Sequence, residues 1–293
     1  MPRSQLTMTQ DTLKNLLPKF IDYLRIKNRS NSTVIAYRAD LEQLINFLQS
    51  KSKVLPQQIT SVDIEIFRDT LLAEKYTPKS VSRKLNAVKT FFRWLVLEKI
   101  VAQDISHQVS HPKIEVGAPK FLSPLEYRAL RDVVRSDVRI ATIVELILQA
   151  GMRISEVAQL KVEDIKNDSI KVAAYATQPE RTIPLNKPAK DALNVYLVNR
   201  KNESPYVFVS KNGNPLAVRN IRAAVDRYMQ KAGIPNYSVN DLRTTFIIEN
   251  LKAGVDLILL SQVVGHKRLS TTEKYLTLAA VTQPGKRQTL QEL

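Results

Sequence analysis

The stretch GHKRLSTTEKY, residues 265–275, places a histidine nine residues before a tyrosine and directly follows a largely apolar run, 258–264. Ser270 and Glu273 have the spacing of a capping box, which predicts that a helix begins at Ser270. Tyr275 then lies about one turn into that helix. A tyrosine at such a position is most often a half-buried packing residue, so this stretch has to be judged together with the rest of the chain.

A second polar stretch, SVNDLR at residues 238–243, has the same kind of start signal. Ser238 and Asp241 form a capping-box pattern, which predicts that another helix begins here. Asn240 and Arg243 then lie on one face near the N-terminus of this helix, where the helix dipole and the unpaired N–H groups favour an anion. For Asn240 alone, simple capping explains the residue equally well.

A third stretch, GMRISEV at residues 151–157, holds an arginine and a glutamate three residues apart. This spacing brings Arg153 and Glu156 onto one helix face, where the carboxylate can hold the guanidinium in place. An ordinary surface ion pair has the same pattern. Gly151 and Gly254 stand where helices are expected to end, as glycines in left-handed C-caps do.

The chain divides at residues 106–120, SHQVSHPKIEVGAPK, which have neither a helical nor a strand period and contain two prolines and a glycine. We interpret this segment as a linker between a first domain, residues 1–105, and a second domain, residues 121–293. The second domain opens with a capping box at Ser123 followed by proline.

The second domain is predicted to be mostly helical with one β-hairpin. Residues 170–175 and 181–185 have the length and composition of two short strands, and the turn between them contains a proline. The expected fold class is therefore mainly α with a small β-hairpin (α+β).

The first domain is predicted to be a bundle of four helices, because apolar residues recur there at spacings of three and four. Thr60 and Thr77 have the form of helix starts. The fourth helix, predicted at 79–100, holds many basic residues and a single acidic one, Glu98. Such a basic face suits a DNA groove, although solvated helix faces also carry Lys and Arg. The DNA-binding candidates are Lys79, Arg83, Lys84, Lys89 and Arg93.

Composition narrows the class of partner. The 293 residues include 44 Lys+Arg against 28 Asp+Glu, a net charge of +16 to which both halves contribute. Phosphate backbones attract such a charge, so nucleic acid is the expected partner and an anionic membrane surface the weaker alternative. The absence of a signal peptide and of a long apolar run predicts a cytoplasmic protein without a membrane partner.

Several kinds of chemistry are excluded by residues that the chain lacks. It has no cysteine, which excludes disulfides, thiol catalysis and Cys-based zinc sites, and its three histidines are too few for a His-rich metal site. It has no P-loop, no GxSxG and no HExxH motif. We therefore expect neither a cofactor nor a metal.

Together, these stretches resemble the tyrosine recombinase, or phage integrase, family, in particular its compact Xer-like members. The family's order of an arginine, an arginine in an xxLR motif, a Gly-His pair and a tyrosine is reproduced in one basic chain, and the resemblance covers nearly its whole length. It implies an N-terminal SAM-like core-binding domain of four helices and a C-terminal catalytic domain, which form a C-shaped clamp on DNA.

The resemblance also implies a role for each motif residue. Arg153 and Arg243 would clamp the non-bridging oxygens of the scissile phosphate, since a guanidinium donates bidentately and keeps its charge. Glu156 would buttress the site, and His266 would bind the phosphate and assist the nucleophile, Tyr275. Attack on phosphorus would leave a 3′-phosphotyrosine and a free 5′-hydroxyl, without ATP or metal.

Two positions depart from the family pattern. Asn240 stands where the family usually has a histidine, and an amide can donate to a phosphate oxygen but cannot carry charge. The family's general-acid lysine in the hairpin turn falls near Ala176 or Thr177, where this chain has no lysine. Lys171 on the first strand is the nearest replacement, provided that the strand register points its side chain toward the site.

The partners implied by the resemblance are duplex DNA, with one recombination half-site per protomer, and further copies of the chain in a tetramer that exchanges strands through a Holliday junction in the nucleoid. A second recombinase or an accessory protein could take part in integration, excision or resolution, as in mobile genetic elements. The segment 276–293 could dock on a neighbouring copy. Two other hypotheses remain open: a DNA-binding relative with little or no catalysis and an accessory role, and a topoisomerase that uses the same chemistry.

Overall fold

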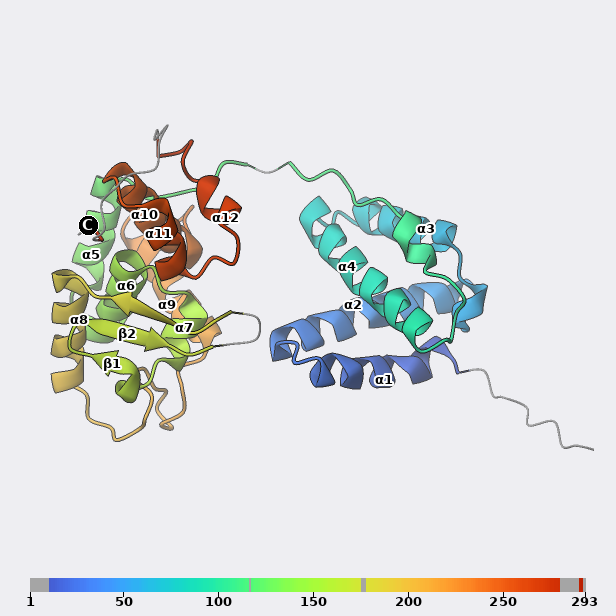
Figure 1. The fold of residues 1–293 in the computed structure, drawn as a ribbon, viewed down its shortest axis with the longest axis horizontal. Helices are drawn as coiled ribbons and strands as arrows, with labels where there is room; N and C mark the ends of the chain where they lie inside the picture. The colour runs from blue at the N-terminus through green and yellow to red at the C-terminus, as the bar shows by residue number, and fades with distance from the viewer. Residues whose placement is uncertain (1–10, 116, 175–177, 280–289, 292–293) are drawn as a thin grey trace, which may run out of the picture. The chain divides into compact units, whose positions relative to one another are not determined.

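The computed structural model describes residues 11–115, 117–174, 178–279 and 290–291. These residues form two compact units that divide between residues 116 and 117 (Figure 1). The first unit is helical, and the second is helical with a small sheet. This is the fold class that the sequence predicts.

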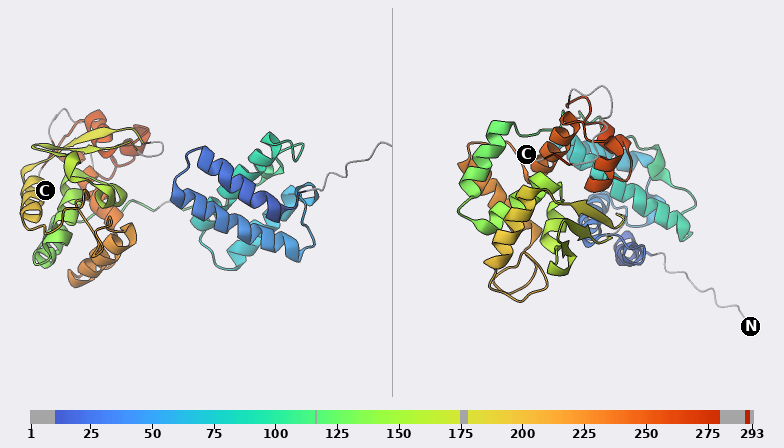
Figure 2. Two further views of the ribbon diagram at one scale, coloured as in Figure 1. Left: turned by 90° about the horizontal axis from the view of Figure 1, so that it is seen from below. Right: turned by 60° about the vertical axis from the view of Figure 1, so that its left-hand side comes forward.

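The first unit is a bundle of four α-helices with two short 3-10 turns. Its helices are α1 (Leu13–Ile26), α2 (Asn31–Ser50), α3 (Ser61–Ala73) and α4 (Pro78–Leu97), and its 3-10 turns are η1 (Pro56–Gln58) and η2 (Ile105–Gln108). Figures 1 and 2 show α1 and α2 side by side, and α2 also packs on α4. The N-caps predicted at Thr60 and Thr77 are present, and each accepts a hydrogen bond from an N–H group that the helix start leaves unpaired.

Aromatic side chains fill the centre of the first unit. The ring of Phe20 on α1 lies 5.2 Å from that of Phe91 and 5.5 Å from that of Trp94, both on α4. Val109 is buried against the same core. The expected linker, 106–120, therefore begins with residues that pack into the first unit, since a segment without periodicity can still bury single apolar side chains.

The second unit is built around α6. Its helices are α5 (Pro124–Val134), α6 (Val138–Ala150), α7 (Ile154–Gln159), α8 (Lys187–Val198), α9 (Val218–Lys231), α10 (Val239–Lys252), α11 (Leu257–Val264) and α12 (Ser270–Glu273), with the 3-10 turn η3 (Val162–Asp164). Every residue of α6 from Ile143 to Ala150 is buried, and the helix contacts α5, α7, α8, α9 and α10. The capping boxes predicted at Ser123 and Ser238 are present.

The sheet of the second unit has three antiparallel strands in the order β1 (Ile165–Lys166), β2 (Ser169–Val172) and β3 (Arg181–Pro184). Ile170 pairs with Ile183, and both side chains are buried. Lys171 pairs with Thr182 on the opposite, exposed face. The predicted hairpin is thus confirmed, whereas the sequence does not predict β1.

Candidate active site

The glycine that ends α6 leads directly into the first motif. Gly151 caps α6 with a left-handed backbone, φ 61°, as predicted. Arg153 is the N-cap of α7, and Glu156 in the first turn accepts from the Arg153 backbone N–H and from its Nη1, each at 2.8 Å. Arg153 is therefore held at the start of α7 by the carboxylate.

Arg181, which the sequence analysis did not single out, completes this pair. It lies on β3 and donates to both oxygens of Glu156, at 2.9 and 2.7 Å. Only 8% of its side chain is exposed. Burial alone would raise the pKa of Glu156, but the hydrogen bonds and charges of Arg181 and Arg153 hold that pKa below its ordinary value. The carboxylate is ionised at neutral pH.

The C-terminal end of α11 gathers three arginines. The backbone carbonyls of residues 263–265 accept, in chain order, from Arg181 at 2.8 Å, from Arg243 at 2.5 Å and from Arg153 at 2.7 Å. These arginines come from β3, α10 and the start of α7. The last carbonyls of a helix have no partner within it and carry partial negative charge, so cations are favourable there. The end of α11 thereby brings together side chains that are far apart in the sequence.

Arg243 is half-buried and contacts a second carbonyl. Its guanidinium also donates to the Gly151 carbonyl. Burial, followed by repulsion from Arg153, lowers the pKa of Arg243 to about 9, so the group is still cationic at neutral pH. Asn240 lies in the first turn of the same helix, is exposed, and makes no side-chain hydrogen bond with any residue that the structure describes.

His266 and Tyr275 lie just beyond the end of α11. Their rings are nearly parallel, at 14°, with centroids 6.4 Å apart. Nδ1 of His266 is hydrogen-bonded with Oγ1 of the buried Thr272 at 2.8 Å, which orients the imidazole. Burial, followed by repulsion from Arg243 and Arg153, lowers the pKa of His266 to about 4. The imidazole is therefore neutral at pH 7.

The helix before the tyrosine begins at Ser270, as predicted, but it lacks the predicted cap and ends before Tyr275. The N-cap of α12 is Leu269 in a helical conformation, and no side chain caps the helix. A capping box needs an extended residue whose side chain turns back to the first N–H groups, and Ser270 is already inside the helix. Tyr275 lies in the turn after Glu273, half-buried, and its hydroxyl makes no hydrogen bond within the described part of the chain.

Lys171 does not point toward the arginine cluster. Arg181 pairs with Val172, so its side chain leaves the sheet on the face opposite to that of Lys171. Lys171 is exposed and its Nζ lies 3.2 Å from a carboxylate oxygen of Glu180. The condition that the sequence analysis placed on Lys171 is not met. The alternative positions, Ala176 and Thr177, lie outside the described residues.

Two of the basic residues of α4 are held by a buried carboxylate. Arg83 donates to both oxygens of Asp40 on α2, and Nζ of Lys84 lies 3.0 Å from one of them. Lys84 is itself buried, with its Nζ over the ring of Tyr76. A buried carboxylate requires such partners, so Lys84 links α2 to α4 and is not on the exposed basic face, contrary to the prediction.

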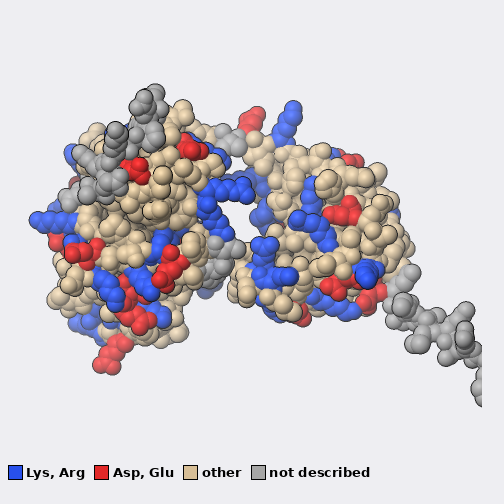
Figure 3. Space-filling view, in the orientation of Figure 1, with Lys and Arg blue, Asp and Glu red and all other residues tan. Residues whose placement is uncertain are grey.

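The other three residues of that set, Lys79, Lys89 and Arg93, make no ion pair with a described residue. Lys79 and Arg93 are exposed and Lys89 is half-buried. Figure 3 shows Lys and Arg side chains over the visible face of each unit, with Asp and Glu among them. This distribution agrees with the excess of positive charge that both halves of the sequence carry.

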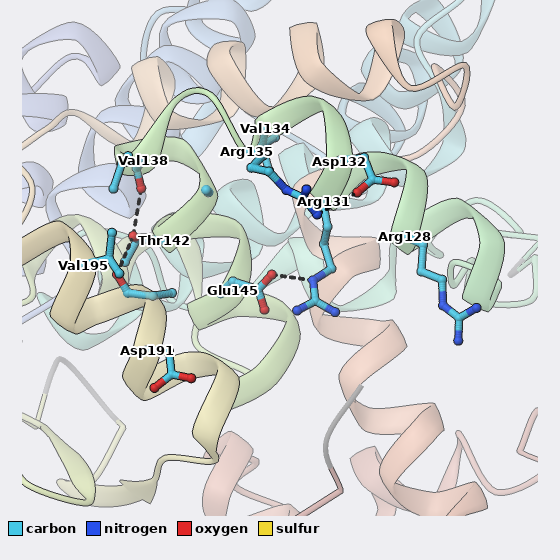
Figure 4. Close-up of a pocket in the computed structure, with 12 residues that line it drawn as sticks. Arg128, Arg131, Asp132, Val134, Arg135, Val138, Thr142, Glu145, Asp191 and Val195 are labelled. Carbon is cyan, nitrogen blue, oxygen red and sulfur yellow. Dashed lines mark hydrogen bonds and ion pairs between the residues drawn. The ribbon is translucent and has the colours of Figure 1, made fainter.

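A hollow of the second unit is separate from this cluster. It lies between α5, α6 and α8, where the side chains of Arg131 and Glu145 point toward each other (Figure 4) and form an ion pair of 2.6 Å. Burial raises the pKa of Glu145 in spite of this arginine. None of the motif residues lines the hollow. Within the described ranges, no group of three or more His, Asp or Glu residues could hold a metal ion, and no helix is long and apolar enough to cross a membrane.

Of the segment 276–293, residues 290–291 lie on this chain's own second unit. The Gln291 N–H donates to Oδ1 of the buried Asn250 on α10 at 2.7 Å, and Leu290 packs against the core. Residues 290–291 thus pack on the second unit of their own chain, whereas the sequence analysis considered docking on a neighbouring copy.

Comparison with known proteins assigns the chain to a family. Residues 120–281 match the model of the phage integrase family, and residues 17–99 match that of the phage integrase N-terminal SAM-like domain. The chain is 31% identical over 281 residues to the tyrosine recombinase XerC of Bacillus licheniformis. The alignment covers 90% of this chain and 91% of the relative.

Solved structures agree with this assignment. The crystal structure of XerA recombinase is 26% identical, with a TM-score of 0.51, and covers 90% of this chain and 93% of that one. A lambda integrase tetramer bound to a Holliday junction shares the fold at 17% identity and a TM-score of 0.72, covering 92% of this chain and 83% of that one. The order of the motif residues, the two units and these likenesses agree: the chain belongs to the phage integrase family and is a Xer-like tyrosine recombinase.

Proposed function

We propose that this recombinase cuts and rejoins duplex DNA at specific sites through a covalent bond to Tyr275. The observation that supports this most directly is the convergence of the motif residues around the end of α11, where Arg153 and Arg243 contact consecutive carbonyls and the His266 and Tyr275 rings lie face to face. A phosphodiester bound by the two guanidinium groups would lie beside the phenol.

The reaction is a transfer of the phosphoryl group from one oxygen to another. The Tyr275 oxygen bonds to phosphorus, its proton passes to the neutral imidazole of His266, and the bond to the 5′-oxygen breaks. The 5′-oxygen leaves as a hydroxyl after taking up a proton. Attack by a 5′-hydroxyl of the exchanged strand reverses these steps and releases Tyr275, so no ATP is consumed.

The arginines act on the charge that develops on the non-bridging oxygens. A guanidinium that is already fixed does not have to reorganise during the reaction, and Arg153 and Arg243 are each fixed by backbone carbonyls. Asn240, in the first turn of α10, donates a neutral hydrogen bond to the same phosphate, weaker than one from a charged group. Lys171 is not assigned as the general acid, because the strand register points it away.

The first unit holds the DNA. Lys79, Lys89 and Arg93, with the exposed part of Arg83, contact phosphates of one core half-site, so binding weakens steeply with salt. By likeness to the lambda integrase tetramer on a Holliday junction, four copies, or two copies of this chain with two of a second recombinase, exchange strands in the nucleoid.

The test is to trap the covalent bond. The protein is incubated with DNA of its own host or element, denatured with SDS, and the attached ends are sequenced, with Tyr275→Phe in parallel. Adducts at discrete sites with wild type alone are expected. Tight, salt-sensitive binding without adducts would instead indicate a non-catalytic relative, and relaxation of supercoiled DNA that lacks such sites would indicate a topoisomerase.

A further inference from the structure

Arg181 differs from the other two arginines of the cluster, because each of its three guanidinium nitrogens donates to the Val263 carbonyl or to Glu156. Nε donates to the Val263 carbonyl at 2.8 Å, and the two terminal nitrogens donate to the two oxygens of Glu156. A bidentate pair of this kind is the strongest geometry available to an arginine and a carboxylate. Only 8% of the Arg181 side chain is exposed, so it presents little surface to DNA.

Glu156 stands between two cations. It accepts a bond from Nη1 of Arg153 at 2.8 Å in addition to the two from Arg181. Without Arg181, the negative charge of Glu156 would be paired with Arg153 alone, and the net charge of that pair would be zero. With Arg181 present, three guanidinium groups including that of Arg243 face a single carboxylate. The cluster then keeps two uncompensated positive charges.

This balance matches the reaction. Attack of a deprotonated phenol on a phosphodiester monoanion gives a dianionic five-coordinate phosphorus, and fixed positive charge lowers the free energy of that state most in a site from which water is excluded. We infer that Arg181 is a positioning residue that neutralises Glu156 and thereby leaves the charge of Arg153 available to the scissile phosphate.

The glycine of the Gly-His stretch fits the same role. A Cβ at Gly265 would lie 3.0 Å from the Arg181 guanidinium, and the Gly265 backbone is left-handed, with φ 66°. Glycine thus lets the backbone before His266 approach Arg181 closely. The strand β3 and the end of α11 are held together at this point.

The inference rests on the proposed function and is tested on a nicked duplex that carries a site mapped by adduct sequencing. Single-turnover cleavage at saturating DNA, DNA affinity and thermal melting are measured for Arg181→Gln, Arg181→Lys and the double variant Glu156→Gln with Arg181→Gln. Arg200→Gln is the control, because Arg200 also donates to backbone carbonyls of the second unit but takes no part in the cluster. If the wild type forms no adduct at all, the proposed function itself fails.

We expect Arg181→Gln to slow cleavage about 10–100-fold while its DNA affinity changes no more than that of the Arg200 control. Arg181→Lys, which keeps the charge, should be faster than Arg181→Gln. The double variant, which removes both charges, should recover about tenfold over Arg181→Gln, a rescue that a purely structural arginine would not show. The inference would be overturned if Arg181→Gln cleaved at the wild-type rate. It would also be overturned if the double variant cleaved no faster than Arg181→Gln. If Arg181→Gln does not fold, the double variant is compared with wild type instead, because it has no unpaired buried charge. A cleavage rate more than about tenfold below that of wild type would then count against the inference.

Discussion

Arg153 and Arg243 should differ in their effect on folding when each is replaced by alanine, although both are proposed to bind one phosphate. The Arg153 side chain is 27% exposed, and Glu156 keeps its bidentate partner Arg181 when Arg153 is removed. Arg243→Ala leaves two backbone carbonyls without their donor, those of Gly151 and Val264, whereas Arg153→Ala leaves one, that of Gly265. An unsatisfied buried acceptor costs about 1–3 kcal/mol, so we expect a loss of unfolding free energy of about 3 kcal/mol for Arg243→Ala and of about half as much for Arg153→Ala.

The effect of the two substitutions on cleavage should be similar. A hydrogen bond to a charged group contributes about 1.5–3 kcal/mol, and a guanidinium can make two to one phosphate. Removal of one pre-oriented donor group from a developing oxyanion typically lowers the rate about 10²–10³-fold. We therefore expect at least this loss for each arginine, with a much smaller change in DNA affinity, because Lys and Arg elsewhere supply most of the phosphate contacts.

The assay is single-turnover formation of the SDS-resistant adduct on a nicked duplex, with affinity from fluorescence anisotropy at fixed salt and stability from urea unfolding. Arg135→Ala is the matched control, since this exposed arginine of the same unit forms a surface ion pair with Asp132 and takes no part in the cluster. Equal losses of affinity and cleavage for either cluster arginine would refute the clamp role. Equal stability losses for Arg153→Ala and Arg243→Ala would refute the argument from burial.

Four further outcomes are expected. The His266 imidazole should titrate by NMR with a midpoint near pH 4, below the ordinary pKa of 6.5, and a midpoint above pH 6 would contradict the burial argument. Between these two values the unfolded chain binds more protons than the folded chain, so His266 lowers the free energy of unfolding as the pH falls from 6.5 to 4. Gly151→Ala should unfold at a clearly lower temperature, because its Cβ would lie 2.4 Å from the Phe246 ring in a left-handed backbone that itself costs about 1–2 kcal/mol. Asp40→Asn should lower the free energy of unfolding by about 3 kcal/mol in denaturant titrations, since two cations lose their buried partner. Lys171→Ala should form the adduct at a rate within about threefold of wild type, because Lys171 points away from the cluster. A hundredfold slower rate that a 5′-phosphorothiolate substrate rescues would instead identify Lys171 as the general acid.

Features that depend on a few neighbouring residues could be predicted from the sequence. The caps at Thr60, Thr77, Ser123 and Ser238 are present because a short polar side chain satisfies N–H groups within three residues of itself, whatever the rest of the fold does. The same spacing at Ser270 did not produce a cap, because the preceding residue, Leu269, is helical in the folded chain. The helix nevertheless begins at Ser270, so the spacing predicted the helix start correctly but not the capping hydrogen bonds.

The exposure of charged residues was harder to predict. Lys84 shares the basic pattern of its helix, yet the carboxylate that holds it lies 44 residues away on α2. Lys171 alternates correctly along its strand, but which face carries the cluster is set by the pairing of Val172 with Arg181. Neither partner can be inferred from the composition of a helix face or from strand alternation alone.

The motif residues could be recognised by their order along the chain, but the electrostatics of the cluster could not. Arg153 reaches a carbonyl 112 residues away and Arg243 one 92 residues away, and Arg181 joins Glu156 across 25 residues and Val263 across 82. An arginine on a short strand has no sequence feature that distinguishes it from a solvated surface residue. Its role becomes visible only when the fold places it against the carboxylate that would otherwise neutralise Arg153. The charge offered to the phosphate is therefore a property of the packed end of α11, which explains why a motif of four residues, each common in proteins, requires a whole domain to act.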